Sequence, residues 1–114
     1  DSMQVPLAVV FFSPTGSRAI QVSGDVSAPN GDVEDWIQFT TAGEIVEIEV
    51  TCTGNTLRAE LWKDEKPLDD FFLSCGDKSF VTVASNSRYF FRISESSVNE
   101  PEYTNYILSM ESIR

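Results

Sequence analysis

The stretch Gly31-Asp-Val-Glu-Asp-Trp-Ile-Gln-Phe39 decides the fold, because an acidic turn leads directly into an alternating strand pattern. Ile37 and Phe39 fall on one face of this segment, while Trp36 and Gln38 fall on the other. Such alternation with a period of two residues is typical of a strand that is buried on one side only. The stretch therefore predicts a sheet that packs against a second layer.

Segments of the same kind follow along the rest of the chain. Residues 46–53 alternate strictly between apolar side chains and acidic or hydroxyl side chains, which is the clearest half-buried strand in the sequence. Residues 63–68 contain two acidic residues and a proline, so the strand before them is expected to end there. Further strands are expected around residues 57–62, 71–73, 81–83, 89–93 and 105–110. In the 81–83 segment, either Val81 and Val83 or Phe80 and Thr82 could take the inner face.

The spacing of these segments predicts the architecture. No window combines sustained helical periodicity with capping residues, and seven to nine short strands about ten residues apart indicate a sandwich or a barrel. We expect an all-β, jelly-roll-like antiparallel β-sandwich. The length of 114 residues predicts a single domain, with residues 20–114 as the sandwich and residues 1–19 as an N-terminal strand or linker region. Residues 7–12 could be its first strand or the end of a preceding module.

The charge balance and the lack of histidine narrow the classes of function. The chain carries 18 Asp and Glu residues against 8 Lys and Arg, which argues against binding nucleic acid or anionic lipid. It contains no histidine, so a Ser-His-Asp or Cys-His catalytic set cannot be built within it. The sequence shows neither a signal peptide nor an apolar run of about 18 residues. We expect the chain to be a piece of a longer protein whose targeting segment is missing here.

The two cysteines, Cys52 and Cys75, lie too far apart for a redox C-x-x-C motif. They could be two buried free thiols or a disulfide between neighbouring strands. An even number of cysteines in a small acidic domain favours the disulfide, and with it an oxidising compartment. The closed loop would stabilise the fold by about 3–3.5 kcal/mol on the chain-entropy model.

Several short motifs occur in a characteristic order. They are Gly24, the 31–39 stretch quoted above, Leu57-Arg-Ala-Glu-Leu-Trp62, Tyr89-Phe-Phe-Arg-Ile93 and Tyr106-Ile-Leu108. This order resembles the bacterial pre-peptidase C-terminal domain family and, more loosely, the collagen-binding domains of bacterial collagenases. In that family a Gly-Asp-x-Asp turn precedes an aromatic strand, and a Tyr-x-Leu strand closes the sheet. The resemblance covers roughly residues 20–111 and implies a secreted, non-catalytic jelly-roll-like sandwich.

The acidic turn is a candidate Ca²⁺ site, formed by Asn30, Asp32, Glu34 and Asp35. Calcium takes six to eight oxygen ligands, often from one closely spaced loop. The resemblance adds that collagen-binding relatives hold calcium near this region. The alternative is that Asp32 and Asp35 accept backbone N–H bonds and fix the turn before the strand.

A second candidate is an outward aromatic patch formed by Trp62 and Phe90, with Trp36 or Tyr103. Exposed aromatic rings are used by many proteins that bind carbohydrate or collagen. The alternative is that these rings pack under loops or against a neighbouring domain. Adjacent acids such as those at 64–65 and 69–70 could form a glycosidase pair, but neighbouring acids in a turn mostly point apart into water.

We therefore expect a non-catalytic, secreted accessory or structural module of a larger extracellular or cell-surface protein. Its expected partners are the neighbouring domains of the parent chain, and a polysaccharide or protein polymer is a further option. The competing expectation is a carbohydrate- or collagen-binding module that uses the exposed aromatics and is assisted by Ca²⁺. We expect no catalytic residues in this chain.

Overall fold

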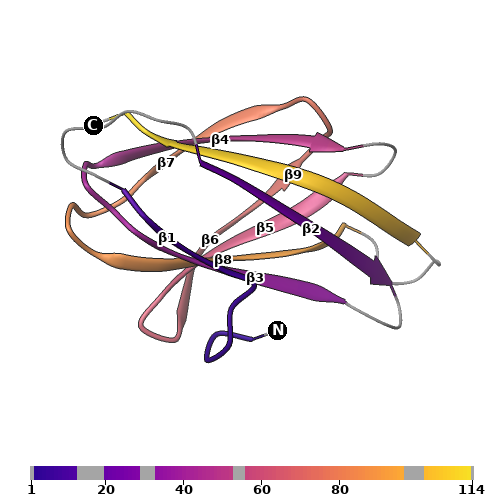
Figure 1. Ribbon diagram of the computed structural model, residues 1–114, viewed down its shortest axis with the longest axis horizontal. Coiled ribbons are helices and arrows are strands. Elements are labelled where there is room, and N and C mark those ends of the chain that lie inside the picture. Colours follow the sequence, from indigo (N-terminus) through magenta and orange to yellow (C-terminus); the bar gives the residue numbers. More distant parts are fainter. Residues whose placement is uncertain (1, 13–19, 29–32, 53–55, 97–101, 114) are drawn as a thin grey trace.

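Two sheets pack face to face in the computed structural model, which describes residues 2–12, 20–28, 33–52, 56–96 and 102–113 (Figure 1). Within these residues there are nine strands and no helix. The strands are β1 (Ala8–Phe11), β2 (Ile20–Ala28), β3 (Glu34–Thr40), β4 (Ile45–Cys52), β5 (Leu57–Lys63), β6 (Lys66–Leu73), β7 (Lys78–Thr82), β8 (Arg88–Glu95) and β9 (Glu102–Ser112). The predicted all-β sandwich is confirmed, and the barrel alternative is not formed.

The chain moves between the two sheets at almost every connection. One sheet has the order β1-β3-β8-β5-β6 and the other has the order β2-β9-β4-β7, so only β5 and β6 follow one another within a sheet. The strand pairs are antiparallel except for β1, which lies parallel to β3 at the edge of the five-stranded sheet. This interlacing places segments that are distant in sequence side by side, which is the arrangement expected of a jelly-roll-like fold.

Apolar side chains from both inner faces fill the space between the sheets. Ile37 and Phe39 are fully buried, as the alternation predicted, and the Phe39 ring stacks on that of Phe91 with the centroids 4.8 Å apart. Burial of one such side chain stabilises the fold by about 1.5–3 kcal/mol. In β7 the inner face belongs to Val81, while Phe80 is 62% exposed. The open alternative for that strand is thus resolved.

β5 ends at Lys63, within the segment where the sequence predicted a strand end, and a tight hairpin follows. Asp64 and Glu65 form a two-residue turn with φ values of 52° and 65°, which is the backbone geometry of the tight turns that join antiparallel strands. The chain then continues directly into β6, so the strand expected around residues 71–73 begins earlier, at Lys66. Pro67 and its acidic neighbours are tolerated because β6 is an edge strand, whose outer backbone groups need no partner in the sheet.

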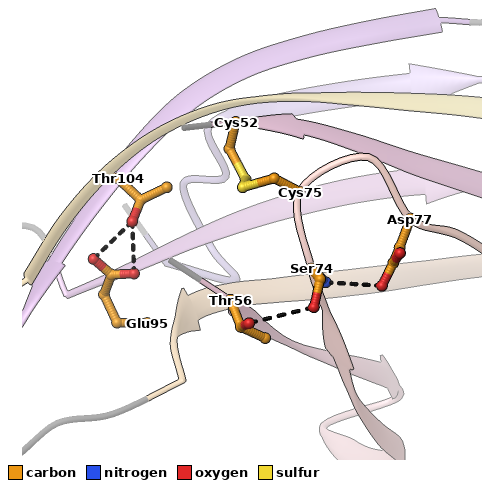
Figure 2. Close-up of a disulfide and its surroundings, with 7 residues drawn as sticks. All are labelled: Cys52, Thr56, Ser74, Cys75, Asp77, Glu95 and Thr104. Carbon is orange, nitrogen blue, oxygen red and sulfur yellow. Dashed lines mark hydrogen bonds between the residues drawn. A yellow bond between two sulfur atoms is a disulfide. The ribbon is translucent and has the colours of Figure 1, made fainter. Parts of the chain in front are cut away.

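The predicted disulfide joins Cys52, at the end of β4, to Cys75 in the connection that follows β6 (Figure 2). The same connection is also hydrogen-bonded to β4 through its backbone, because the Gly76 N–H donates to the Val50 carbonyl at 2.7 Å. Since β6 and β4 belong to different sheets, this staple ties the sandwich together at one end.

Candidate functional site

The outer face of the five-stranded sheet brings three of the predicted aromatic residues together. Trp36 lies on β3, Trp62 on β5 and Phe90 on β8, and the Trp36 ring meets the other two edge to face at centroid distances of 5.4 and 6.3 Å. Trp36 and Phe90 are each only 7% exposed, and Trp62 is half-buried. The three rings therefore pack mainly against one another, and they do not form an exposed row on which a flat ligand could stack.

Tyr103 lies apart from this cluster, on β9 in the other sheet, and is 58% exposed. Its hydroxyl donates a hydrogen bond to Asp25 at 2.9 Å and lies 3.0 Å from Asn105. The bond to Asp25 raises the pKa of Tyr103, because it favours the protonated phenol.

A ladder of ion pairs crosses the same outer face beside the aromatic cluster. It runs from Glu34 on β3 through Arg92, Glu60 and Arg58 to Asp70 on β6. Arg92 lies 2.8 Å from both of its acidic partners, and Arg58 donates two hydrogen bonds to Asp70 at 2.9 and 2.6 Å. The ladder thus links four neighbouring strands by side chains as well as by the backbone.

The two tryptophans are hydrogen-bonded to this ladder. The Trp36 indole N–H donates to Glu34, and the Trp62 indole N–H donates to Glu60 at 3.2 Å. Burial alone would raise the pKa of Glu34, but the hydrogen bonds from Arg92 and Trp36 outweigh it and hold the pKa below its usual value. A carboxylate of this kind suits a fixed ion pair, whereas a general acid needs a raised pKa.

The candidate calcium ligands are only partly described. Asn30 and Asp32 lie outside the described residues. Glu34 points outward to Arg92, and Asp35 points inward and is 1% exposed, so the two diverge across β3. In the described parts of the chain, no group of three or more Asp, Glu, Cys or His residues is placed to hold a metal ion.

Asp35 instead takes part in a contact between the two sheets. The Tyr106 hydroxyl, from β9, donates to the Asp35 carboxyl at 2.6 Å. Gly24 on β2 lies beside this pair, and a Cβ atom there would lie 2.5 Å from the Tyr106 hydroxyl oxygen and 2.6 Å from Asp35 Oδ2. Only glycine leaves room for the contact, so these three residues form one structural unit.

Glu95 is a second buried carboxyl group that the sequence did not indicate. It is 2% exposed at the end of β8 and lies 2.8 and 3.0 Å from the hydroxyl of Thr104, as Figure 2 shows. In the sequence it sits at the border of a polar segment, where an acid is normally solvated, so no local signal distinguishes it.

A hollow of about 600 Å³ opens on the outer face next to Phe90. It is bounded by the N-terminal segment on one side and by the β5–β6 turn on the other. Its lining consists of Met3, Gln4, Gln38, Asp64, Glu65, Arg88 and Phe90. Among the residues that the structure describes, no helix is long and apolar enough to cross a membrane.

Neither the family models nor the curated proteins contain a match to this sequence. Solved structures do match. PliG of Aeromonas hydrophila, a periplasmic inhibitor of g-type lysozyme, superposes with a TM-score of 0.59 at 12% identity, over 93% of this chain and 96% of PliG. PliG of Salmonella Typhimurium gives a TM-score of 0.55 at 12% identity, over 93% of this chain and 99% of its own.

The pre-peptidase C-terminal domain of collagenase from Bacillus anthracis is also similar, with a TM-score of 0.58 at 16% identity over 96% of this chain and 99% of that domain. The resemblance expected from the sequence is therefore supported at the level of the fold. The same sandwich is shared with the lysozyme inhibitors, and identities this low establish the fold alone.

Proposed function

We propose that this chain is a non-catalytic accessory or structural module of a larger extracellular or cell-surface protein. The observation that carries the proposal is that its buried and half-buried carboxyl groups are bound by other side chains of the same fold. Asp35 and Glu95 accept hydrogen bonds from hydroxyl groups inside the sandwich, and Glu34 and Glu60 are bound by arginine. These carboxyl groups serve the fold, and the collagenase domain of the same fold supports the assignment.

The disulfide supports a location outside the reducing cytoplasm, because such bonds persist mainly in oxidising compartments. The description of the PliG structures as periplasmic agrees with this. The net charge of −10 suits a soluble surface that repels copies of itself. The partners in this role are the neighbouring domains of the parent chain.

The test is to delete this domain from the gene product that contains it and to assay the remaining protein. We expect turnover of a small soluble substrate by the neighbouring domain to stay within about twofold, because this module supplies no reacting group. Secretion, or activity on a polymeric substrate, should fall. Loss of turnover on the small substrate, with the neighbouring domain still folded, would mean that this module takes part in catalysis.

A second candidate function is a binding module for carbohydrate or collagen. It is favoured by the partly exposed ring of Trp62, which lies on the outer face beside Trp36, since aromatic side chains are common where proteins bind ligands. Titration with soluble oligosaccharides and with a collagen triple-helical peptide tests it, and g-type lysozyme belongs in the same panel because of the PliG likeness. A Trp62→Ala variant should weaken the binding that is found.

A further inference from the structure

The hollow beside Phe90 differs from the rest of the outer face in how its polar side chains are used. In the ion-pair ladder each charged side chain is bound by a neighbour. In the hollow, the side chains of Gln38 and Arg88 make no hydrogen bond or ion pair within the described part of the chain, and neither do those of Asp64 and Glu65. The charged side chains of the ladder are thus paired with one another, whereas the polar side chains of the hollow remain able to bind a ligand.

These polar groups come from two separate parts of the fold that both line the hollow. Gln38 lies in the middle of β3, and Arg88 lies at the start of the neighbouring strand β8. The two are close because Arg88 pairs in the β3–β8 register with Thr40, two residues after Gln38. Asp64 and Glu65 stand on the tight turn between β5 and β6, which lines the same hollow. The hollow is thus lined by donors from the sheet and by acceptors from the turn, and its volume of about 600 Å³ is typical of small-ligand sites.

The chemistry of this set selects a class of ligand. Two carboxylates repel an anion, and the guanidinium of Arg88 offsets part of their charge, so a neutral ligand that forms several hydrogen bonds suits the hollow. The set presents donors and acceptors together: guanidinium N–H groups, amide groups that both donate and accept, and carboxylates that accept. Neighbouring hydroxyl groups match it, because each hydroxyl can donate to a carboxylate and accept from an amide or guanidinium.

We propose that this hollow binds a short neutral oligosaccharide, held by Gln38 and Arg88 on the sheet and by Asp64 and Glu65 on the turn. The inference deepens the binding-module candidate above and rests on it. Since Phe90 is only 7% exposed, it offers the sugar little surface for stacking. We therefore expect weak binding, with dissociation constants of about 0.1–2 mM.

The experiment is a heteronuclear NMR titration of the whole chain, labelled with ¹⁵N, with cellotetraose, maltotetraose and chitotetraose in turn, each to 5 mM. We expect at least one of them to shift the signals of Gln38, Arg88 and Phe90 in a saturable manner. Gln38→Ala and Arg88→Ala should each weaken that binding by about tenfold, as expected when a hydrogen bond to a polar ligand is lost.

The matched control is Gln21→Ala, because Gln21 is an exposed glutamine on β2 in the opposite sheet. It should leave the affinity unchanged, and urea unfolding should show that all three variants fold as the parent does. Saturable shifts that map to the other sheet, or binding that survives both hollow variants, would refute this site while leaving a binding module standing. The absence of binding by all three sugars would refute the saccharide proposal. Collagen-peptide binding in the same series would then keep the broader candidate.

Discussion

Gly24→Ala tests whether the contact between Asp35 and Tyr106 positions the two sheets. In an open position this substitution stabilises a protein by about 0.4–1 kcal/mol, because alanine restricts the unfolded chain. Here the added Cβ would lie 2.5 Å from the Tyr106 hydroxyl oxygen, 2.6 Å from Asp35 Oδ2 and 2.8 Å from Tyr106 Cζ. All three distances are shorter than real contacts allow, so both side chains must shift away from residue 24, and we expect this shift to disrupt their hydrogen bond. We therefore expect Gly24→Ala to destabilise the protein instead of stabilising it.

The magnitude follows from two costs. Forcing extra volume into a packed interior costs about 1–3 kcal/mol, and losing a hydrogen bond to a buried acidic group costs about 1.5–3 kcal/mol. After the gain from alanine is subtracted, we expect Gly24→Ala to lower the free energy of unfolding by about 2–4 kcal/mol. Tyr106→Phe should lower it by about 1.5–3 kcal/mol, since it removes only the hydroxyl donor.

Both substitutions break the same hydrogen bond, so their effects should not add. We expect the double variant to be more stable than the sum predicts by at least about 1 kcal/mol. Urea unfolding monitored by tryptophan fluorescence measures all four free energies. Ser23→Ala, at the exposed position beside Gly24, is the control and should change stability by less than about 0.5 kcal/mol. Additive effects, or a Gly24→Ala variant as stable as the parent, would refute the reasoning.

Three further outcomes are expected. Replacing Cys52 and Cys75 with alanine should lower the free energy of unfolding by about 3–3.5 kcal/mol, since their sequence separation is 23, and a loss under 1 kcal/mol in urea unfolding would contradict this. The folded-state pKa of Glu34 lies below its usual value of 4.5, so its contribution to the free energy of unfolding is present above pH 4.5 and is lost as the pH falls through the folded-state pKa. Arg92→Gln should make this loss of stability with falling pH shallower in unfolding titrations between pH 5 and pH 2. An unchanged dependence of stability on pH would count against the ion pair. Melting curves with Ca²⁺ and with chelator should agree within about 1 °C, because the described acids near residues 34–35 are already bound by the protein, and a rise of several degrees with Ca²⁺ would instead establish the metal site.

The sequence predicted the strands whose faces differ sharply in polarity. Residues 46–53 alternate without exception, and all but the last lie in β4, where the expected face is buried at Val46, Ile48 and Val50. Only the end of β6 was predicted, around residues 71–73, because Pro67 and the acids near it are typical of loops, whereas an edge strand tolerates them. The alternation of a segment indicates which face of the strand is buried, but it does not indicate whether the strand lies at the edge or in the middle of a sheet.

The candidate site was predicted in the same partial way. Alternation alone places Trp36, Trp62 and Phe90 on the outer side of their strands, and the structure shows all three there. Their burial could not be predicted, because it depends on ring contacts between strands that are adjacent only in space. The Arg92 contacts with Glu34 and Glu60, which span 58 and 32 residues of sequence, are of the same kind.

The residues that carry the family resemblance bear directly on where function can lie. Gly24, Asp35 and Tyr106 come from three separate motifs, yet they meet in one contact between the sheets. A sequence pattern made of these residues therefore reflects how the two sheets pack together. Proteins of different function can share it when their sheets pack in the same way. The lysozyme inhibitors and the collagenase domain share the fold at 12–16% identity, as expected if the fold is kept while the outer surfaces diverge. What distinguishes this chain must therefore be sought on its outer faces, where the side chains of Gln38 and Arg88 make no hydrogen bond to any other described residue.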